Sequence, residues 1–103
     1  MTRRLCRHAD LGKTGHLCTT VIGVQATQGV VFANGIPVLR RGDPAFPHKI
    51  QNPNRPPRCK PHSSKVNRGS SSVFCLNIPV ARVYDSFDQK FMIKGSANVF
   101  SGG

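Results

Sequence analysis

Apolar residues along this chain come in short runs that are separated by Gly, Pro, Asn and Asp. No window carries apolar residues sustained at the helical spacing i, i+3, i+4, i+7. Short β-favouring runs that end in turn residues are instead typical of strands joined by tight turns. The pattern therefore predicts an all-β domain built of short β-hairpins.

One such run occurs twice. Residues 31–43 (VFANGIPVLRRGD) return 42 positions later as residues 73–85 (VFCLNIPVARVYD), and seven of the thirteen paired positions are identical. In the first copy, Asn34-Gly35 is the dipeptide of a tight hairpin turn. The second copy has Leu76-Asn77 there, a weaker turn pair because Asn must then adopt the positive φ that Gly accepts freely. A fixed-period repeat indicates a copied supersecondary unit, so we expect related hairpin units at 29–43 and 71–85.

Two partial copies lie at the ends of the chain. Residues 95–100 (GSANVF) match residues 69–74 (GSSSVF), and residues 4–10 (RLCRHAD) resemble the tail of a unit whose hairpin is missing. We therefore predict half-units at 1–10 and 95–103. Joining the two ends would give three units around one axis, that is, a single domain with pseudo-threefold symmetry.

The connecting segments differ in character. Residues 17–24 are predicted to form a strand, and residues 86–94 a turn followed by a strand. The longest connection, the Pro/basic-rich loop 44–68, contains too many prolines for a regular helix or a central strand. A long loop in a small domain is usually functional or disordered. Because this one carries two of the four histidines and a cysteine, we expect it to be functional.

Composition limits the core and the cellular context. With 103 residues, no Trp, 10 Gly and 8 Pro, the chain is expected to need a metal, disulfides or a partner for stability. It carries no apolar run long enough to span a bilayer and no signal peptide, so synthesis in the cytoplasm is the default expectation. Cysteines there are usually reduced or metal-bound rather than paired.

The formal net charge of +11 raises the alternative of a basic nucleic-acid-binding module. The cations are scattered along the sequence and are dense only at 55–68. A single Tyr and no Trp leave little for base stacking. We therefore do not expect nucleic acid as the partner.

Four residues in the connections form the strongest candidate site. His16 follows Asp10 by six residues and His48 follows Asp43 by five, so a rotation between units would bring their loops together. Cys59 and His62 form a Cys-x-x-His pair. Three His and one Cys make a closed tetrahedral set that suits structural zinc. The alternative is that these histidines are solvated loop residues and Cys59 is a free thiol.

Other Cys and His residues compete for this role. Cys18, two residues beyond His16, is the most credible substitute ligand. Cys6 and Cys75 are predicted to be buried in the core as small apolar groups, and His8 is expected at a surface turn.

Catalysis has little support. The chain has no Glu, and three of its four Asp recur at matching repeat positions, which indicates turn capping rather than chemistry. A closed metal site also leaves no open position for substrate. We expect that the protein is not an enzyme.

These motifs resemble the PAAR proteins, which are named for a Pro-Ala-Ala-Arg repeat. Pro37-Val38-Leu39-Arg40 and Pro79-Val80-Ala81-Arg82 are similar to that repeat, and residues 31–43 are similar to the family's unit. The ending 95–103 is similar to the family's C-terminus. Departures are Tyr84 in place of Gly and Leu76 in place of the turn Asn.

The resemblance implies a small conical fold with three similar faces and a metal ion near the vertex. Such a protein would sit as a monomer on the blunt end of a trimeric β-helical spike, in a contractile phage tail or a type VI secretion system, and pierce the target cell envelope. It would lie at the virion tail tip, or in the producing bacterium's cytoplasm before ejection, and no toxin domain is attached.

The resemblance also implies a ligand set and a docking surface. The ligands would be His16, His48, Cys59 and His62, around one zinc ion with iron as the alternative metal. The spike-binding candidates are the three Val-Phe starts, which could equally be internal core: Val31, Phe32, Val73, Phe74, Val99 and Phe100.

Overall fold

The computed structural model describes residues 2–51 and 59–102; residues 1, 52–58 and 103 are not described. The described chain is a small all-β domain of short antiparallel hairpins, as the sequence pattern predicts. The strands are β1 (Arg3–Arg4), β2 (Leu11–Lys13), β3 (Val21–Gly23), β4 (Phe32–Ala33), β5 (Ile36–Pro37), β6 (His48–Gln51), β7 (Cys59–His62), β8 (Phe74–Cys75), β9 (Ile78–Pro79), β10 (Ser86–Phe87), β11 (Lys90–Phe91) and β12 (Phe100–Ser101). No helix among the described residues is long and apolar enough to cross a membrane.

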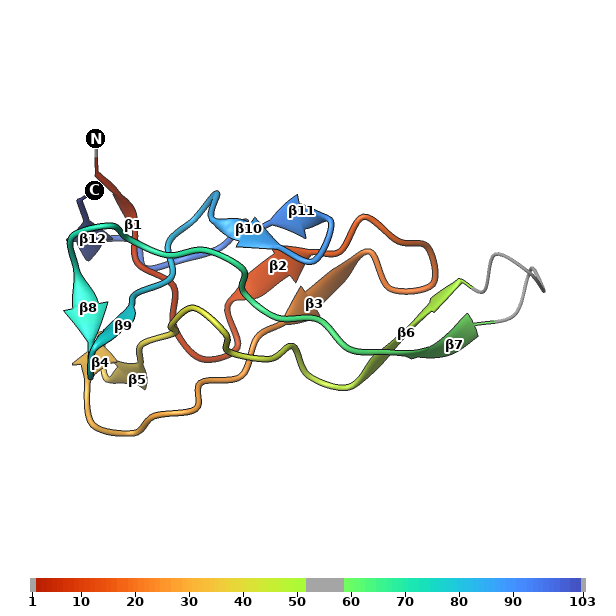
Figure 1. Ribbon diagram of the computed structural model, residues 1–103, viewed down its shortest axis with the longest axis horizontal. Helices are drawn as coiled ribbons and strands as arrows, with labels where there is room; N and C mark the ends of the chain where they lie inside the picture. Colours follow the sequence, from red (N-terminus) through yellow and green to blue (C-terminus); the bar gives the residue numbers. More distant parts are fainter. Residues whose placement is uncertain (1, 52–58, 103) are drawn as a thin grey trace.

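Most strands pair with their immediate neighbours in sequence. The hairpins are β2–β3, β4–β5, β6–β7, β8–β9 and β10–β11, and each is antiparallel. The exception is β1, which pairs with β12 so that Arg4 lies opposite Phe100 and the two ends of the described chain meet (Figure 1). The predicted half-units at the two ends therefore lie together.

Turn residues explain the two repeated hairpins. Asn34 and Gly35 have φ angles of 55° and 74° between β4 and β5, and Leu76 and Asn77 have 51° and 69° between β8 and β9. Two successive residues at positive φ form the turn whose twist matches that of paired strands. Leu76 adopts this conformation although its Cβ atom disfavours it.

Three equivalent turns follow the repeated strands. In each turn an aspartate accepts a hydrogen bond on Oδ2 from the backbone N–H three residues earlier, at 2.7, 2.8 and 2.8 Å. The aspartates are Asp10, Asp43 and Asp85, and all three are buried. This confirms the prediction that these residues cap turns.

A closed ring of backbone hydrogen bonds joins the three turns. Cys6 N–H donates to the Ala81 carbonyl at 2.9 Å, Ala81 N–H to the Leu39 carbonyl at 2.9 Å, and Leu39 N–H to the Cys6 carbonyl at 3.0 Å. All three residues are fully buried. The three repeat units are thus arranged around one axis rather than side by side in one continuous sheet.

The core consists of two small clusters. The larger combines Cys6, Leu39 and Ala81 at the ring, and Val83 from the same repeat unit as Ala81, with residues from the connecting segments: Val24, Val66, Phe87 and Met92. The smaller lies under the repeated hairpins and contains Leu5, Ala33, Val38, Cys75 and Val80. Cys6 and Cys75 are therefore core residues, as predicted.

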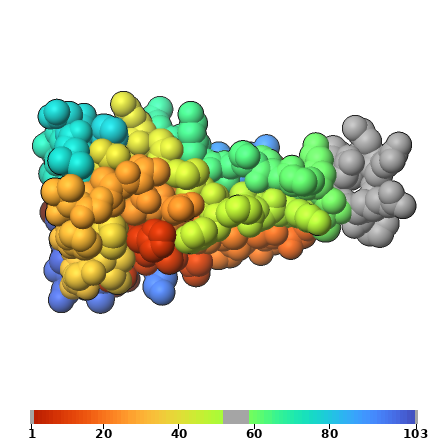
Figure 2. Space-filling view, turned by 90° about the horizontal axis from the view of Figure 1, so that it is seen from below, coloured from red at the N-terminus to blue at the C-terminus, as the bar shows by residue number. Residues whose placement is uncertain are grey.

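The molecule narrows along its long axis. Its principal extents are 42, 26 and 23 Å. Strands β1, β4, β5, β8, β9 and β12 gather at the wide end, whereas β6–β7 and the loop after β2 extend towards the narrow end (Figures 1 and 2). We call these the wide end and the narrow end.

Two predictions about the connections are wrong, and one holds in part. Residues 17–24 do not form one strand: only Val21–Gly23 does, because the chain bends where Gly15 and Cys18 adopt positive φ. The described part of 44–68 contains neither a helix nor a central strand, as predicted, but it is more than a loop because it includes the β6–β7 hairpin, whose edge strands accept Pro61. Residues 86–94 form a hairpin, β10–β11, rather than a turn and one strand.

Candidate metal centre

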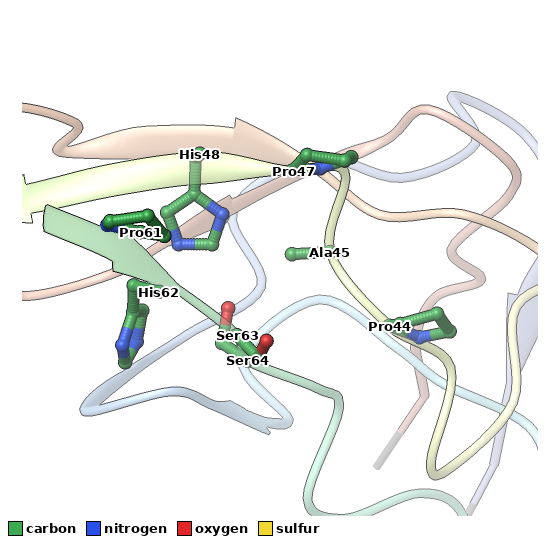
Figure 3. Close-up of a pocket in the computed structure, with 8 residues that line it drawn as sticks. All are labelled: Pro44, Ala45, Pro47, His48, Pro61, His62, Ser63 and Ser64. Atoms are coloured by element: carbon green, nitrogen blue, oxygen red, sulfur yellow. The ribbon is translucent and has the colours of Figure 1, made fainter.

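The centre begins with a cross-strand histidine pair. His48 opens β6 and His62 ends β7, and the two residues lie directly opposite each other. Side chains of such a pair share one face and start about 5 Å apart. Their ring centroids are 5.2 Å apart, and both side chains border a hollow on the surface (Figure 3).

Two further hairpins each supply a side chain. His16 lies in the loop between β2 and β3, and Asp88 lies in the turn between β10 and β11. The Asp88 carboxylate contacts His16 Nε2 at 3.0 Å through Oδ1 and His62 Nε2 at 2.9 Å through Oδ2. The His16 and His62 rings are 4.9 Å apart. One carboxylate thus holds two imidazoles from different elements.

The geometry of His16, His62 and Asp88 suits a metal ion. One donor atom from each lies within 4.8 Å of the others. The Asp88 side chain is only 6% exposed, against 18% for His16 and 23% for His62. A buried carboxylate is stable only when hydrogen-bond donors or a cation contact it, and a divalent cation held by the three side chains would meet this need. Imidazole and carboxylate are donors that zinc accepts.

His48 lies beside this cluster, and one of its ring nitrogens has a lone pair that no hydrogen bond uses. Its Nδ1 is 2.8 Å from the Phe46 carbonyl oxygen, so Nδ1 carries the hydrogen because a carbonyl only accepts. Its Nε2 is then a lone-pair acceptor, and it is buried with no hydrogen-bond partner. A backbone carbonyl that fixes the tautomer in this way is typical of metal-binding histidines. His48 nevertheless lies outside the group of donor atoms within 4.8 Å of one another, which contains only His16, His62 and Asp88 among the described residues.

Cys59 does not belong to the centre, which corrects the predicted ligand set. It forms a disulfide with Cys18 and has no thiolate to offer. The Cys-x-x-His spacing also fails in its actual conformation, because Cys59 and His62 occupy the two ends of an extended strand. Residues three apart in a strand face opposite sides and lie about 10 Å apart. The expectation that cysteines stay unpaired is wrong for this pair.

Asp88 is the ligand candidate that sequence reasoning missed. The candidate ligands were chosen among His and Cys alone, and residues 86–94 contain neither. Its position was informative: it follows Asp85 by three residues, in the connection that corresponds to those carrying His16 after Asp10 and His48 after Asp43. All three connections therefore contribute to the cluster.

The remaining candidates lie elsewhere. Burial raises the pKa of both the Cys6 and Cys75 thiols, which keeps them protonated and unreactive. His8 accepts a hydrogen bond from the Ala26 N–H at 3.0 Å through Nδ1. His8 therefore has a structural partner of its own.

Comparison with family models and with curated sequences identifies no relative. No family model matches the chain, and no curated protein sequence shows significant similarity to it. Function is therefore inferred from the repeat and the site.

Proposed function

We propose that this protein is a PAAR-type tip: a conical, metal-stabilised point that caps the trimeric β-helical spike of a contractile injection machine. Its role is structural rather than enzymatic. The wide end docks on the spike, and the narrow end leads into the target cell envelope. The protein would be found at the virion tail tip or, before ejection, in the bacterial cytoplasm.

Pseudo-threefold organisation supports this proposal. Beyond the ring of backbone hydrogen bonds, an equivalent cap precedes each Val-Phe start. Gln28, Ser70 and Ser96 each accept two backbone N–H groups with one side-chain oxygen, at 2.8 to 3.2 Å. Three similar edges around one axis match the three equal chain ends that a trimer presents. A monomer without such a partner has no evident need for them.

The observation that carries the proposal is a set of three equally exposed phenylalanines. Phe32, Phe74 and Phe100 are 52%, 55% and 53% exposed, and they belong to β4, β8 and β12 at the wide end (Figure 1). Large exposed apolar side chains of this kind usually mark an interaction surface. They lie on short strands whose free edges a spike strand could extend. We call these three residues the Phe triad.

Neighbouring valines complete the surface unevenly. Val31 and Val73 are each 39% exposed, whereas Val99 is half-buried against the smaller core cluster. The phenylalanines are therefore surface residues rather than internal core, and Val99 serves in part as core. Docking would bury the Phe triad and the two exposed valines together.

The proposal is tested with a triple variant of the Phe triad. Phe32→Ser, Phe74→Ser and Phe100→Ser together are expected to abolish co-elution with the spike trimer encoded in the same genome, while the variant stays folded. Leu17→Ser is the matched control, because Leu17 is 62% exposed but lies in the loop at the narrow end. Wild type should bind at one chain per trimer. Unchanged binding by the triple variant would refute this surface.

A basic zinc-containing nucleic-acid module remains the alternative. Its densest basic segment, 55–68, lies partly outside the described residues, including Arg55 and Arg58. Tight DNA binding with a steep dependence on salt would favour it. The threefold set of exposed phenylalanines favours the spike instead.

A further inference from the structure

A covalent cross-link lies beside the candidate metal centre. Cys18, in the loop between β2 and β3, is bonded to Cys59 at the start of β7. The loop also carries His16, two residues before Cys18, and β7 also carries His62. The disulfide thus joins the two elements that supply the histidines of the cluster.

The loop around His16 depends on few contacts for its position. Within it, Thr14 Oγ1 donates to the Thr19 carbonyl at 2.6 Å and accepts from the His16 N–H at 3.0 Å. To the neighbouring hairpin, the Leu17 carbonyl accepts from the Gln51 N–H at 2.9 Å. Leu17 and Cys18 are exposed, whereas Thr14 at the start of the loop is fully buried. Burial therefore fixes the base of this segment but contributes little to the part that carries Cys18.

Backbone conformation at Cys18 indicates that the cross-link constrains the loop. Cys18 has a φ of 75°, in the left-handed region that non-glycine residues rarely occupy. A residue persists there when its surroundings over-determine it. Breaking the bond to Cys59 would leave this turn free to relax, and His16 would move with it.

We infer that the Cys18–Cys59 disulfide is a positioning device for the metal centre: it holds His16 against His62 and Asp88, so that metal affinity depends on the redox state of this pair. This inference rests on the proposed metal centre. Such coupling is reciprocal, so the bound metal also stabilises the disulfide against reduction.

The redox step is selective for this pair. A dithiol reductant transfers two electrons and two protons to the Cys18–Cys59 bond, giving two thiols, and itself becomes a cyclic disulfide. Both half-cystines are exposed, whereas Cys6 and Cys75 are 0% and 3% exposed. A soluble dithiol therefore reaches the cross-link without involving the core thiols.

The test compares zinc affinity in two redox states of one chain. The oxidised protein and a sample reduced with dithiothreitol, then desalted without oxygen, are each titrated with zinc chloride against a chromophoric chelator. Cys18→Ser/Cys59→Ser gives a permanently open form. We expect the reduced and double-variant proteins to bind zinc about 5- to 150-fold more weakly, the usual range for coupled sites.

Two controls separate positioning from general stability. Cys75→Ala removes a core thiol and introduces the residue that its repeat counterpart, Ala33, already has. Val38→Ala opens a cavity in the smaller cluster at the wide end. Both are expected to bind zinc with wild-type affinity, even where Val38→Ala lowers the unfolding temperature.

The outcomes distinguish this inference from the proposed function. Equal affinity of oxidised and reduced protein, or tighter binding after reduction, would overturn the positioning role while leaving the metal centre in place. Tighter binding would show that the freed thiolates are ligands. An oxidised protein that binds no zinc would remove the metal centre itself, and the inference with it.

Discussion

A close contact between two hairpins offers a direct test of the fold around the centre. Gly12 is buried in β2, and a Cβ added there would lie 2.3, 2.6 and 2.9 Å from three ring carbons of Phe87. The Phe87 ring is fully buried. Overpacking of this kind usually costs about 1–3 kcal/mol. We therefore expect Gly12→Ala to lower the free energy of unfolding by that amount.

Gly29→Ala is the matched control for this change. No atom lies within 4 Å of the Cβ it would add, and Gly29 has no positive φ. Replacing an unconstrained Gly by Ala usually stabilises a fold by about 0.4–1 kcal/mol through the unfolded chain. In denaturant unfolding with a chelator present, the free energy of unfolding should therefore fall in Gly12→Ala and rise in Gly29→Ala.

A second substitution shows whether the ring is responsible. Phe87→Leu removes the atoms that the new methyl group would meet, so in Gly12→Ala/Phe87→Leu the two costs should be less than additive by about 1 kcal/mol or more. Asp88 follows Phe87 directly, so Gly12→Ala should also weaken zinc binding. If Gly12→Ala proves as stable as Gly29→Ala, the packing of β2 against β10 described above is wrong.

Three further predictions concern the charges and cross-links. Zinc at a hundredfold excess over its dissociation constant should add about 2.7 kcal/mol of stability, a rise of roughly 10–20 °C in unfolding temperature for a domain of this size. Calorimetry of Asp88→Ala should show no rise in unfolding temperature when zinc is added, because this variant lacks the carboxylate of the site. Without metal, Cys18→Ser/Cys59→Ser should lower the free energy of unfolding by about 4 kcal/mol, since the bond spans 41 residues. An unchanged free energy of unfolding in chemical denaturation would contradict this prediction. Arg82→Ala should lower the free energy of unfolding by about 3 kcal/mol, because it leaves the buried Asp85 carboxylate with weaker pairing. Arg40→Ala should cost much less, because the Arg40 guanidinium contacts the Thr27 hydroxyl rather than the aspartate of its own turn.

The repeat made the wide end predictable. Its hairpins depend on local turn chemistry at Asn34-Gly35 and on the aspartate caps, both of which are visible in the sequence. The incomplete units at the two ends of the chain also predicted that these ends would meet, and they pair as β1 and β12. Local determinants of this kind need no knowledge of the rest of the fold.

The centre was only partly predictable because its members come from different elements. His16 and His62 were identified from residue type, but the choice of Cys59 rested on the Cys-x-x-His spacing, which separates the two side chains in the strand found there. Strand formation there depends on pairing with β6, which the prolines of the segment argued against. Asp88 resembled the capping aspartates, and only the tertiary arrangement shows its carboxylate between two imidazoles.

Both cross-links lie where hydrophobic burial is weakest. Along β6 and β7, Ile50 is the one buried residue among the described positions, and it belongs to neither core cluster. An isolated two-stranded hairpin is marginally stable in water. A domain that projects such a hairpin along its axis therefore needs other bonds to fix it, and the His16–His62–Asp88 cluster and the Cys18–Cys59 disulfide both connect it to neighbouring loops. In the proposed tip, the metal cluster and the disulfide lie towards the narrow end because that end is too thin to contain a hydrophobic core.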